Sequence, residues 1–324
     1  MIRTRMTELL GIRYPIMQGG MQHFGIPEMA AAVSNAGGLG CLNAANFPAY
    51  DDLRDAIRRT KALCGERPFA VNVSIFPEII PLERIGRYLE IAGEEGVAVI
   101  ESAGQSPEPF VPLIHSYGMK HIHKVPDPKH AVTAQRIGVD LVTIAGLEVA
   151  GHPGMQEVGT MVLARKTARL VEIPVLVAGG IADGSGLAAA LALGGEGVVM
   201  GTRFLATREC PLTQPFKDWV LNANEKDTVL AQKSIRNMIR VANNATARRC
   251  LEMEAQGATL AELMTVIAGT KSRAAYAAGD VEGAMFAVGP AIGLIDDIPT
   301  CAALLERMEA EAEETIRGLS ARLV

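Results

Sequence analysis

The chain of 324 residues is 49% hydrophobic and has a net charge of −5. This balance supplies a large core, and without a cluster of lysine and arginine it argues against nucleic acid or an anionic membrane as a partner. Five scattered cysteines without a Cys-x-x-Cys pair predict neither a disulfide framework nor a zinc site. No apolar segment reaches the ~20 residues of a membrane span, and no signal-peptide core is present, so we expect a cytoplasmic protein.

Eight short runs are predicted to be strands, and most of them are apolar throughout, as strands covered on both faces must be. They lie at residues 14–18, 39–42, 69–73, 97–101, 119–124, 140–144, 174–178 and 197–200. Helices are predicted between and after them at residues 27–36, 51–63, 83–95, 109–117, 128–137, 158–171 and 184–193. Eight βα units over roughly 200 residues predict an α/β fold, the (β/α)8 TIM barrel. An open, doubly wound sheet is the weaker alternative, since no dinucleotide fingerprint follows the first strand.

The pattern changes after the eighth strand. Between residues 211 and 298 we predict no buried strand, and helices at residues 217–223, 231–243, 245–255, 260–268 and 271–279. A last helix at residues 300–323 would close the barrel. We therefore expect a barrel at residues 1–208, a helical insertion domain at 209–298 and a C-terminal helix at 299–324.

The loop after the sixth predicted strand contains His152 between Gly151 and Pro153-Gly154. Glycines allow a planar ligand to approach the backbone closely, and they leave the imidazole exposed. Loops at the carboxyl ends of barrel strands are where barrel enzymes place their chemistry. We therefore expect His152 to be catalytic, with a tight turn that holds a solvated histidine as the alternative.

Several other polar or glycine positions end predicted strands and would open on the same face of a barrel. They are Gln18, Asn72, Glu101, Lys124, Gly179-Gly180 and Gly201-Thr202. The two glycine turns follow consecutive strands, and their backbone N–H groups indicate a phosphate site. Lys124 would place a positive charge in the barrel mouth, although an exposed turn lysine is the alternative.

Two further features need an interpretation. His121 and His123 are spaced like metal ligands, but no carboxylate motif accompanies them. If Lys124 points into the barrel, strand alternation turns both rings toward the helices, so no metal site is expected. Met17 and Met21 flank Gln18 and could offer a soft apolar surface to a flat ring.

The sequence resembles the nitronate monooxygenase family, formerly called 2-nitropropane dioxygenases. The segments that carry the resemblance extend over essentially the whole chain and lie at residues 15–21, 72, 123–124, 146–152, 178–184, 200–204 and 293–299. The resemblance implies an FMN-binding TIM barrel with a helical second domain.

The resemblance also implies a role for individual residues. Gln18, Asn72 and Lys124 would contact the isoalloxazine or the ribityl chain, and His152 would be the active-site histidine. Gly151, Gly180, Gly201 and Thr202 would hold the phosphate. The remaining residues of the expected FMN-binding set are Gly19, Ala178, Gly179 and Met200.

The activity implied by the family is the oxidation of alkyl nitronates with oxygen. His152 would orient the nitro group, or remove the α-proton of a neutral nitroalkane if it titrates near neutrality. The Ala-Gly-His-Pro-Gly form looks most like an NADH:quinone reductase subgroup, from which the chain departs at Ala145, a position that is often acidic.

Other functions stay open at this point. They are a flavin-dependent enoyl reductase, a flavin- or phosphate-binding regulatory barrel, and a barrel that binds a phosphosugar without flavin. The expected partners are small molecules, namely a nitronate, a quinone or NAD(P)H, and a homodimer is left open.

Overall fold

The computed structural model describes residues 1–76 and 80–323. Eight parallel strands form one sheet in the order β1-β8-β7-β6-β5-β4-β3-β2. The strands are β1 Ile16–Gln18, β2 Gly40–Asn43, β3 Phe69–Ile75, β4 Val99–Gly104, β5 Lys120–Val125, β6 Leu141–Ala145, β7 Val175–Ala178 and β8 Gly197–Met200. A parallel bridge between Met17 and Leu39 joins β1 to β2. The ring is therefore closed, which confirms the (β/α)8 barrel and excludes the open sheet.

The Gln18 side chain completes the seam between β1 and β2. Its Nε2 donates to the Cys41 carbonyl at 3.0 Å, and its Oε1 accepts from the Cys41 N–H at 3.3 Å. Gln18 is 0% exposed, so its amide takes the place of ladder bonds that these short strands do not make themselves.

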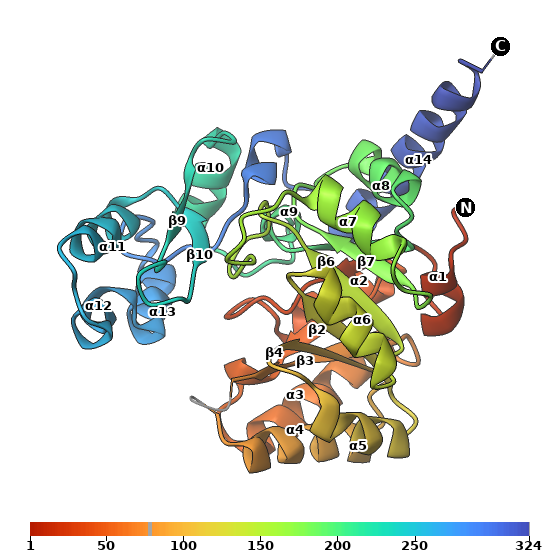
Figure 1. Ribbon diagram of the computed structural model, residues 1–324, viewed down its shortest axis with the longest axis horizontal. Helices are drawn as coiled ribbons and strands as arrows, with labels where there is room; N and C mark the ends of the chain where they lie inside the picture. The colour runs from red at the N-terminus through yellow and green to blue at the C-terminus, as the bar shows by residue number, and fades with distance from the viewer. Residues whose placement is uncertain (77–79, 324) are drawn as a thin grey trace.

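Helices surround the barrel at the predicted positions (Figure 1). They are α2 Pro27–Asn35, α3 Tyr50–Cys64, α4 Leu82–Glu94, α5 Val111–Ser116, α6 Pro128–Arg136, α7 Thr160–Ala168, α8 Gly184–Ala192 and α14 Cys301–Ser320. Several of these helices begin after a short polar residue whose side chain caps the first backbone N–H groups. The Asp183 carboxylate, for example, accepts from the Gly186 N–H at 2.7 Å at the start of α8.

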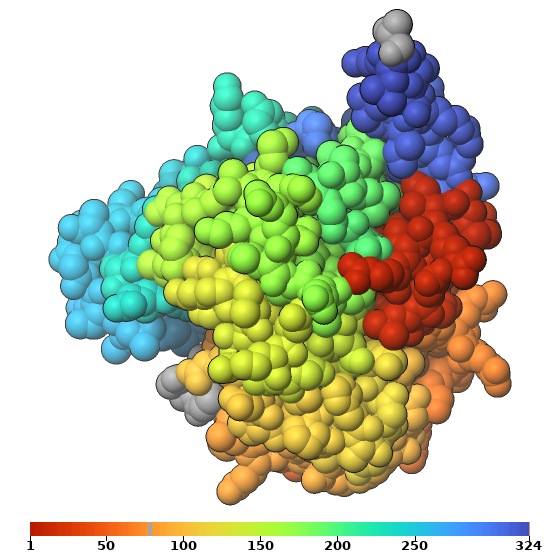
Figure 2. Space-filling model, turned by 45° about the vertical axis from the view of Figure 1, so that its right-hand side comes forward, coloured from red at the N-terminus to blue at the C-terminus, as the bar shows by residue number. Residues whose placement is uncertain are grey.

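The last helix, α14, packs against α8. A Cβ on Gly184 would lie 2.4 Å from the Cβ of Glu311, so the two helices approach each other at a residue without a side chain. The N-terminal helix α1, Arg5–Leu10, lies beside α14 (Figures 1 and 2), where the Ile2 N–H donates to the Glu309 carboxylate at 3.0 Å. A helix thus forms where the last one was predicted, at residues 301–320.

Side chains fill the barrel in layers. The lower layer is apolar, and side chains of α1 cover it from below; its members include Met6, Leu10, Met17, Leu39, Ala70, Val99, Ile122, Leu141, Leu176 and Val199. Because successive side chains of a strand alternate between its two faces, the residues two positions further along these strands also face the interior. Those residues are polar on three consecutive strands: Asn72 on β3, Glu101 on β4 and Lys124 on β5.

The segment between the barrel and α14, residues 209–298, is called the insertion below. Four helices form in it as predicted: α10 Gln214–Asn222, α11 Ala245–Ala255, α12 Leu260–Ile267 and α13 Gly269–Ala278. The helix predicted at residues 231–243 is wrong, because β9 Thr228–Ala231 and β10 Ile239–Ala242 form an antiparallel hairpin there. These strands have four residues each and are mostly half-buried, and β9 begins with Thr228 while β10 contains Arg240, so neither is apolar throughout.

The insertion packs at the side of the barrel where β6 and its following loop lie (Figure 1). It has a small apolar cluster of its own, and it also shares the large cluster of the barrel. Aromatic rings make part of that shared contact, because Phe24 of the barrel lies 5.1 Å from Tyr276 of α13 between ring centroids. Across residues 1–76 and 80–323, the structure contains no helix that is both long and apolar enough to span a membrane.

Candidate active site

The polar upper layer of the barrel is held together by buried hydrogen bonds. Asn72 Nδ2 donates to the Glu101 carboxylate at 2.7 Å, and Cys41 Sγ lies 3.9 Å from the same oxygen. The backbone of Gly20 crosses directly above, since a Cβ there would lie 2.3 Å from Cγ of Asn72. Asn72 is thus fixed between Glu101 below and the loop after β1 above.

Lys124 brings a positive charge to this layer. Its side chain is half-buried, and the structure gives it no ion pair or hydrogen bond among the residues it describes. Thr143, its neighbour on β6, is fully buried and its Oγ1 has no hydrogen-bond partner. A buried hydroxyl and an unpaired ammonium group in one barrel mouth indicate a place for a polar, electron-rich ligand.

His152 lies in the loop after β6, within reach of the charge of Lys124. Its side chain is exposed, yet desolvation by the surrounding protein, helped by the charge of Lys124, lowers its pKa to about 4. This lowered pKa favours a neutral imidazole at pH 7 and does not favour a group that titrates near neutrality; the role of His152 stays a prediction.

Residues 146–159 are called the His152 loop below. Glu148, near the start of this loop, binds Thr160, which follows its last residue. Its carboxylate accepts from the Thr160 N–H at 2.9 Å and from the Thr160 hydroxyl at 2.8 Å. Thr160 begins α7, so the loop carries its own cap for that helix. Glu148 lies in residues 146–152, one of the segments that carry the family resemblance, but no role was predicted for it.

The two glycine turns lie side by side, because β7 pairs with β8. Gly179 and Gly180 have φ values of 109° and 78°, a region that residues with a Cβ rarely adopt. In the described chain the N–H groups of Gly180, Gly201 and Thr202 donate to no acceptor. Convergent free N–H groups at the ends of neighbouring strands suit a phosphate.

Not every predicted residue reaches this mouth. The amide of Gln18 is used in the barrel seam, and Met17 is fully buried in the lower layer, so neither presents a surface to a ligand. Met200 is also buried, and its carbonyl accepts from the Gly19 N–H at 2.9 Å. Met21 is half-buried and lies close to Gly201, where it remains available.

His121 and His123 lie elsewhere. Ile122 between them faces the barrel interior, and both rings bond to the Ser102 hydroxyl, at 2.7 and 2.8 Å. Burial lowers the pKa of His121 to about 3 and that of His123 to about 4. The expectation from strand alternation, that they point toward the helices, agrees with this arrangement.

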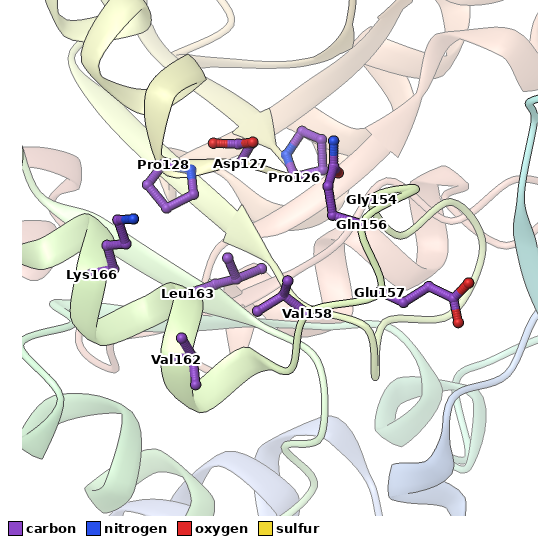
Figure 3. Close-up of a pocket in the computed structure, with 10 residues that line it drawn as sticks. All are labelled: Pro126, Asp127, Pro128, Gly154, Gln156, Glu157, Val158, Val162, Leu163 and Lys166. Carbon is purple, nitrogen blue, oxygen red and sulfur yellow. The ribbon is translucent and has the colours of Figure 1, made fainter.

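Two hollows lie on the outside of the barrel. One, of about 280 Å³, is bounded by Pro126-Asp127-Pro128, by the His152 loop and by α7 (Figure 3). The other, of about 350 Å³, lies between the segment after β4 and α6, and His123 and His130 line part of it. Both flank the candidate site without including the upper layer.

Comparison with known proteins relates the chain to a family. A family model described as nitronate monooxygenase matches residues 3–311. The structure of FabK from Thermotoga maritima superposes with a TM-score of 0.92, is 38% identical, and covers 100% of both chains. The (3aS,4S,5R,7aS)-5-hydroxy-7a-methyl-1-oxo-octahydro-1H-indene-4-carboxyl-CoA dehydrogenase of Rhodococcus jostii is 31% identical over 99% of this chain and 98% of the relative. A protein named probable nitronate monooxygenase from Staphylococcus saprophyticus is 32% identical over 71% of this chain and 75% of the relative.

Proposed function

The chain belongs to the nitronate monooxygenase family, and from this premise we propose that it is an FMN-dependent oxidoreductase that oxidises alkyl nitronates with oxygen. The observation that carries the proposal is the unpaired ammonium group of Lys124 in the barrel mouth, whose charge helps to lower the pKa of the His152 imidazole. A nitronate is an anion, so it gains from the charge of Lys124 and needs no base to remove a proton.

The residues of the mouth fit FMN. The free N–H groups of Gly180, Gly201 and Thr202 would hold its phosphate, and Asn72 and Lys124 would lie along its polar ring edge. When bound, FMN supplies the electron transfer between substrate and oxygen. We further propose that Gly151, Gly179, Ala178 and Gly19 line the same space with their backbone, because none of them carries a side chain larger than a methyl group.

His152 would orient the substrate in this scheme. A neutral imidazole with a pKa of about 4 is a weak base at pH 7, but one ring nitrogen can donate a hydrogen bond to a nitro oxygen. The positive charge of Lys124 also disfavours a second positive charge on the ring. Substitution of His152 by Gln should therefore retain FMN, keep a donor and lower kcat for a nitronate less than His152→Ala does.

A second function is favoured by the coverage of the relatives. The FabK structure and the CoA-ester dehydrogenase align with essentially this whole chain, including the insertion, whereas the match to the staphylococcal nitronate monooxygenase covers 71% of it. The alternative is a reductase of an activated double bond in a thioester, with NAD(P)H as the electron donor. A quinone as the electron acceptor is a further variant of this reaction.

One anaerobic experiment separates these functions. The purified yellow protein is mixed with propane-2-nitronate, and in a second reaction with NADH or NADPH followed by an enoyl thioester or a quinone. Bleaching of the flavin by the nitronate and not by NAD(P)H is expected. Bleaching by NAD(P)H and recovery of the colour with the enoyl thioester would overturn the nitronate assignment in favour of the reductase, and a colourless protein would overturn both.

A further inference from the structure

We propose that Arg240, on strand β10 of the insertion, is the positioning residue that fixes His152 at the barrel mouth. The inference rests on the proposed function only in taking His152 as the residue that meets the substrate. The insertion would then help to position an active-site residue, although Arg240 lies 88 residues further along the chain than His152.

Backbone pairing joins the hairpin to the His152 loop. The Gly151 N–H donates to the Arg240 carbonyl at 3.1 Å, and the Arg240 N–H donates to the Gly151 carbonyl at 2.6 Å. Gly151 and Arg240 thus form an antiparallel bridge, the smallest unit of a sheet. Because His152 follows Gly151 directly, this bridge sets the direction in which the imidazole leaves the backbone.

The Arg240 side chain adds a second attachment. Its Nε donates to the Leu147 carbonyl at 3.0 Å, and its Nη1 donates to the Thr228 hydroxyl of β9 at 3.0 Å. One guanidinium group therefore connects the beginning of the His152 loop with the hairpin, in a planar geometry that a lysine cannot reproduce.

The electrostatics of Arg240 agree with a positioning role. Desolvation lowers the pKa of this guanidinium, against the opposing influence of Glu148 and Glu157, and no described carboxylate lies within ion-pair distance of it. A partly desolvated cation that bonds to neutral oxygens contributes little net stability. The planar guanidinium group of Arg240 instead fixes the position of the His152 loop relative to the hairpin.

The middle of the His152 loop packs on the barrel only in part: Pro153 and Gly154 are buried, and a hollow lies beside the residues that follow them. Gly154, Gln156, Glu157 and Val158 form one wall of the hollow of about 280 Å³, with Pro126 on the opposite wall (Figure 3). The insertion also meets the loop at Gly289, where a Cβ would lie 2.4 Å from the Glu148 carbonyl oxygen, and through an ion pair of 2.7 Å between Lys233 and Glu157, whose side chains are 45% and 44% exposed. Exposed pairs of this kind contribute ~0–1 kcal/mol, so the Arg240 attachment is the stronger one.

The test uses the full-length, FMN-loaded protein and compares Arg240→Ala and Arg240→Lys with the control Arg236→Ala. Arg236 is exposed, lies in the same hairpin and makes no described side-chain bond. The readouts are flavin content, the kcat and KM for propane-2-nitronate, and the titration of His152 by NMR of ¹³C-labelled histidine, assigned with His152→Gln.

For Arg240→Ala we expect flavin to be retained, the His152 pKa to rise from about 4 toward the ordinary value of 6.5, and kcat to fall on the order of tenfold to a hundredfold. Arg240→Lys should not restore kcat, whereas added guanidinium should partly rescue Arg240→Ala. Arg236→Ala should behave as the wild type does.

An unchanged His152 titration and kcat in Arg240→Ala would overturn the proposal. If Arg240→Ala fails to fold, the test uses Thr228→Val, which removes one hydrogen-bond acceptor of Arg240 and leaves the backbone bridge. We expect a smaller rise of the His152 pKa in this variant, and an unchanged pKa would refute the positioning role. The titration needs no substrate, so a protein that is inactive with nitronates would refute the proposed function without affecting this result.

Discussion

Alanine at Gly151 should disturb the active site through backbone strain alone. Gly151 has a φ of 73°, and a Cβ added there would meet no atom within 4 Å. The steric conflict is therefore internal to the residue, and the left-handed conformation costs an L-residue ~1–2 kcal/mol. Alanine also restricts the unfolded chain, which offsets ~0.4–1 kcal/mol of that cost. The expected net loss in the free energy of unfolding is about 1 kcal/mol.

Gly257 provides a matched control. It has a φ of 77°, and a Cβ there would also meet nothing within 4 Å, but it lies in the turn before α12. Urea titrations followed by circular dichroism should give similar losses for Gly151→Ala and Gly257→Ala. The effect on kcat should differ, because only Gly151 is paired with Arg240 and followed by His152.

Activity and unfolding together decide the outcome. We expect Gly151→Ala to reduce kcat at least severalfold while Gly257→Ala leaves it unchanged. Equal kcat values in the two variants, at equal losses of stability, would show that the bridge between Gly151 and Arg240 does not control the position of the imidazole.

Three further expectations follow from the upper layer and the core. Lys124→Met should raise the KM for an anionic nitronate on the order of tenfold, and an unchanged KM at equal flavin content would contradict the assigned charge pairing. His121 and His123 have folded-state pKa values of about 3 and 4, below the ordinary 6.5. Burial of the two neutral rings therefore carries no pH-dependent cost above pH 6.5, and the free energy of unfolding falls below that pH by about 1.4 kcal/mol per pH unit for each group, down to pH 4. Urea titrations from pH 7 to 4 should show a smaller loss in a His121→Phe, His123→Phe double variant. Phe286→Ala should lower the free energy of unfolding by about 3–5 kcal/mol, because its ring is fully buried against Phe216; a loss below 1 kcal/mol would mean that the insertion does not depend on this contact.

The barrel could be predicted because parallel strands bury both faces. Runs such as residues 174–178 and 197–200 are apolar throughout, and only a few folds place eight strands in parallel. The hairpin of the insertion could not be predicted in the same way. Its strands are short and half-buried, and β10 carries Arg240 in its middle, so its extended form depends on pairing with β9 and Gly151.

The residues of the upper layer were also predictable, since the carboxyl ends of parallel strands meet at one end of a barrel. Asn72 lies within β3, Lys124 lies near the end of β5 and His152 lies in the loop after β6; these positions were predicted, and the roles of the three residues stay predictions. The same reasoning assigned Gln18 to the mouth, but the seam between β1 and β2 uses its amide, a demand that arises only when the ring closes.

The sequence by itself therefore determined the type of fold and which strand ends carry polar groups, because both depend on local pattern and on the repetition of βα units. Only the tertiary structure decided the protonation of His152, which depends on desolvation and on the charge of Lys124. It also decided that Arg240 reaches the His152 loop. This contact depends on how the insertion packs on the barrel, and a local sequence pattern cannot predict a contact between residues so far apart in the chain.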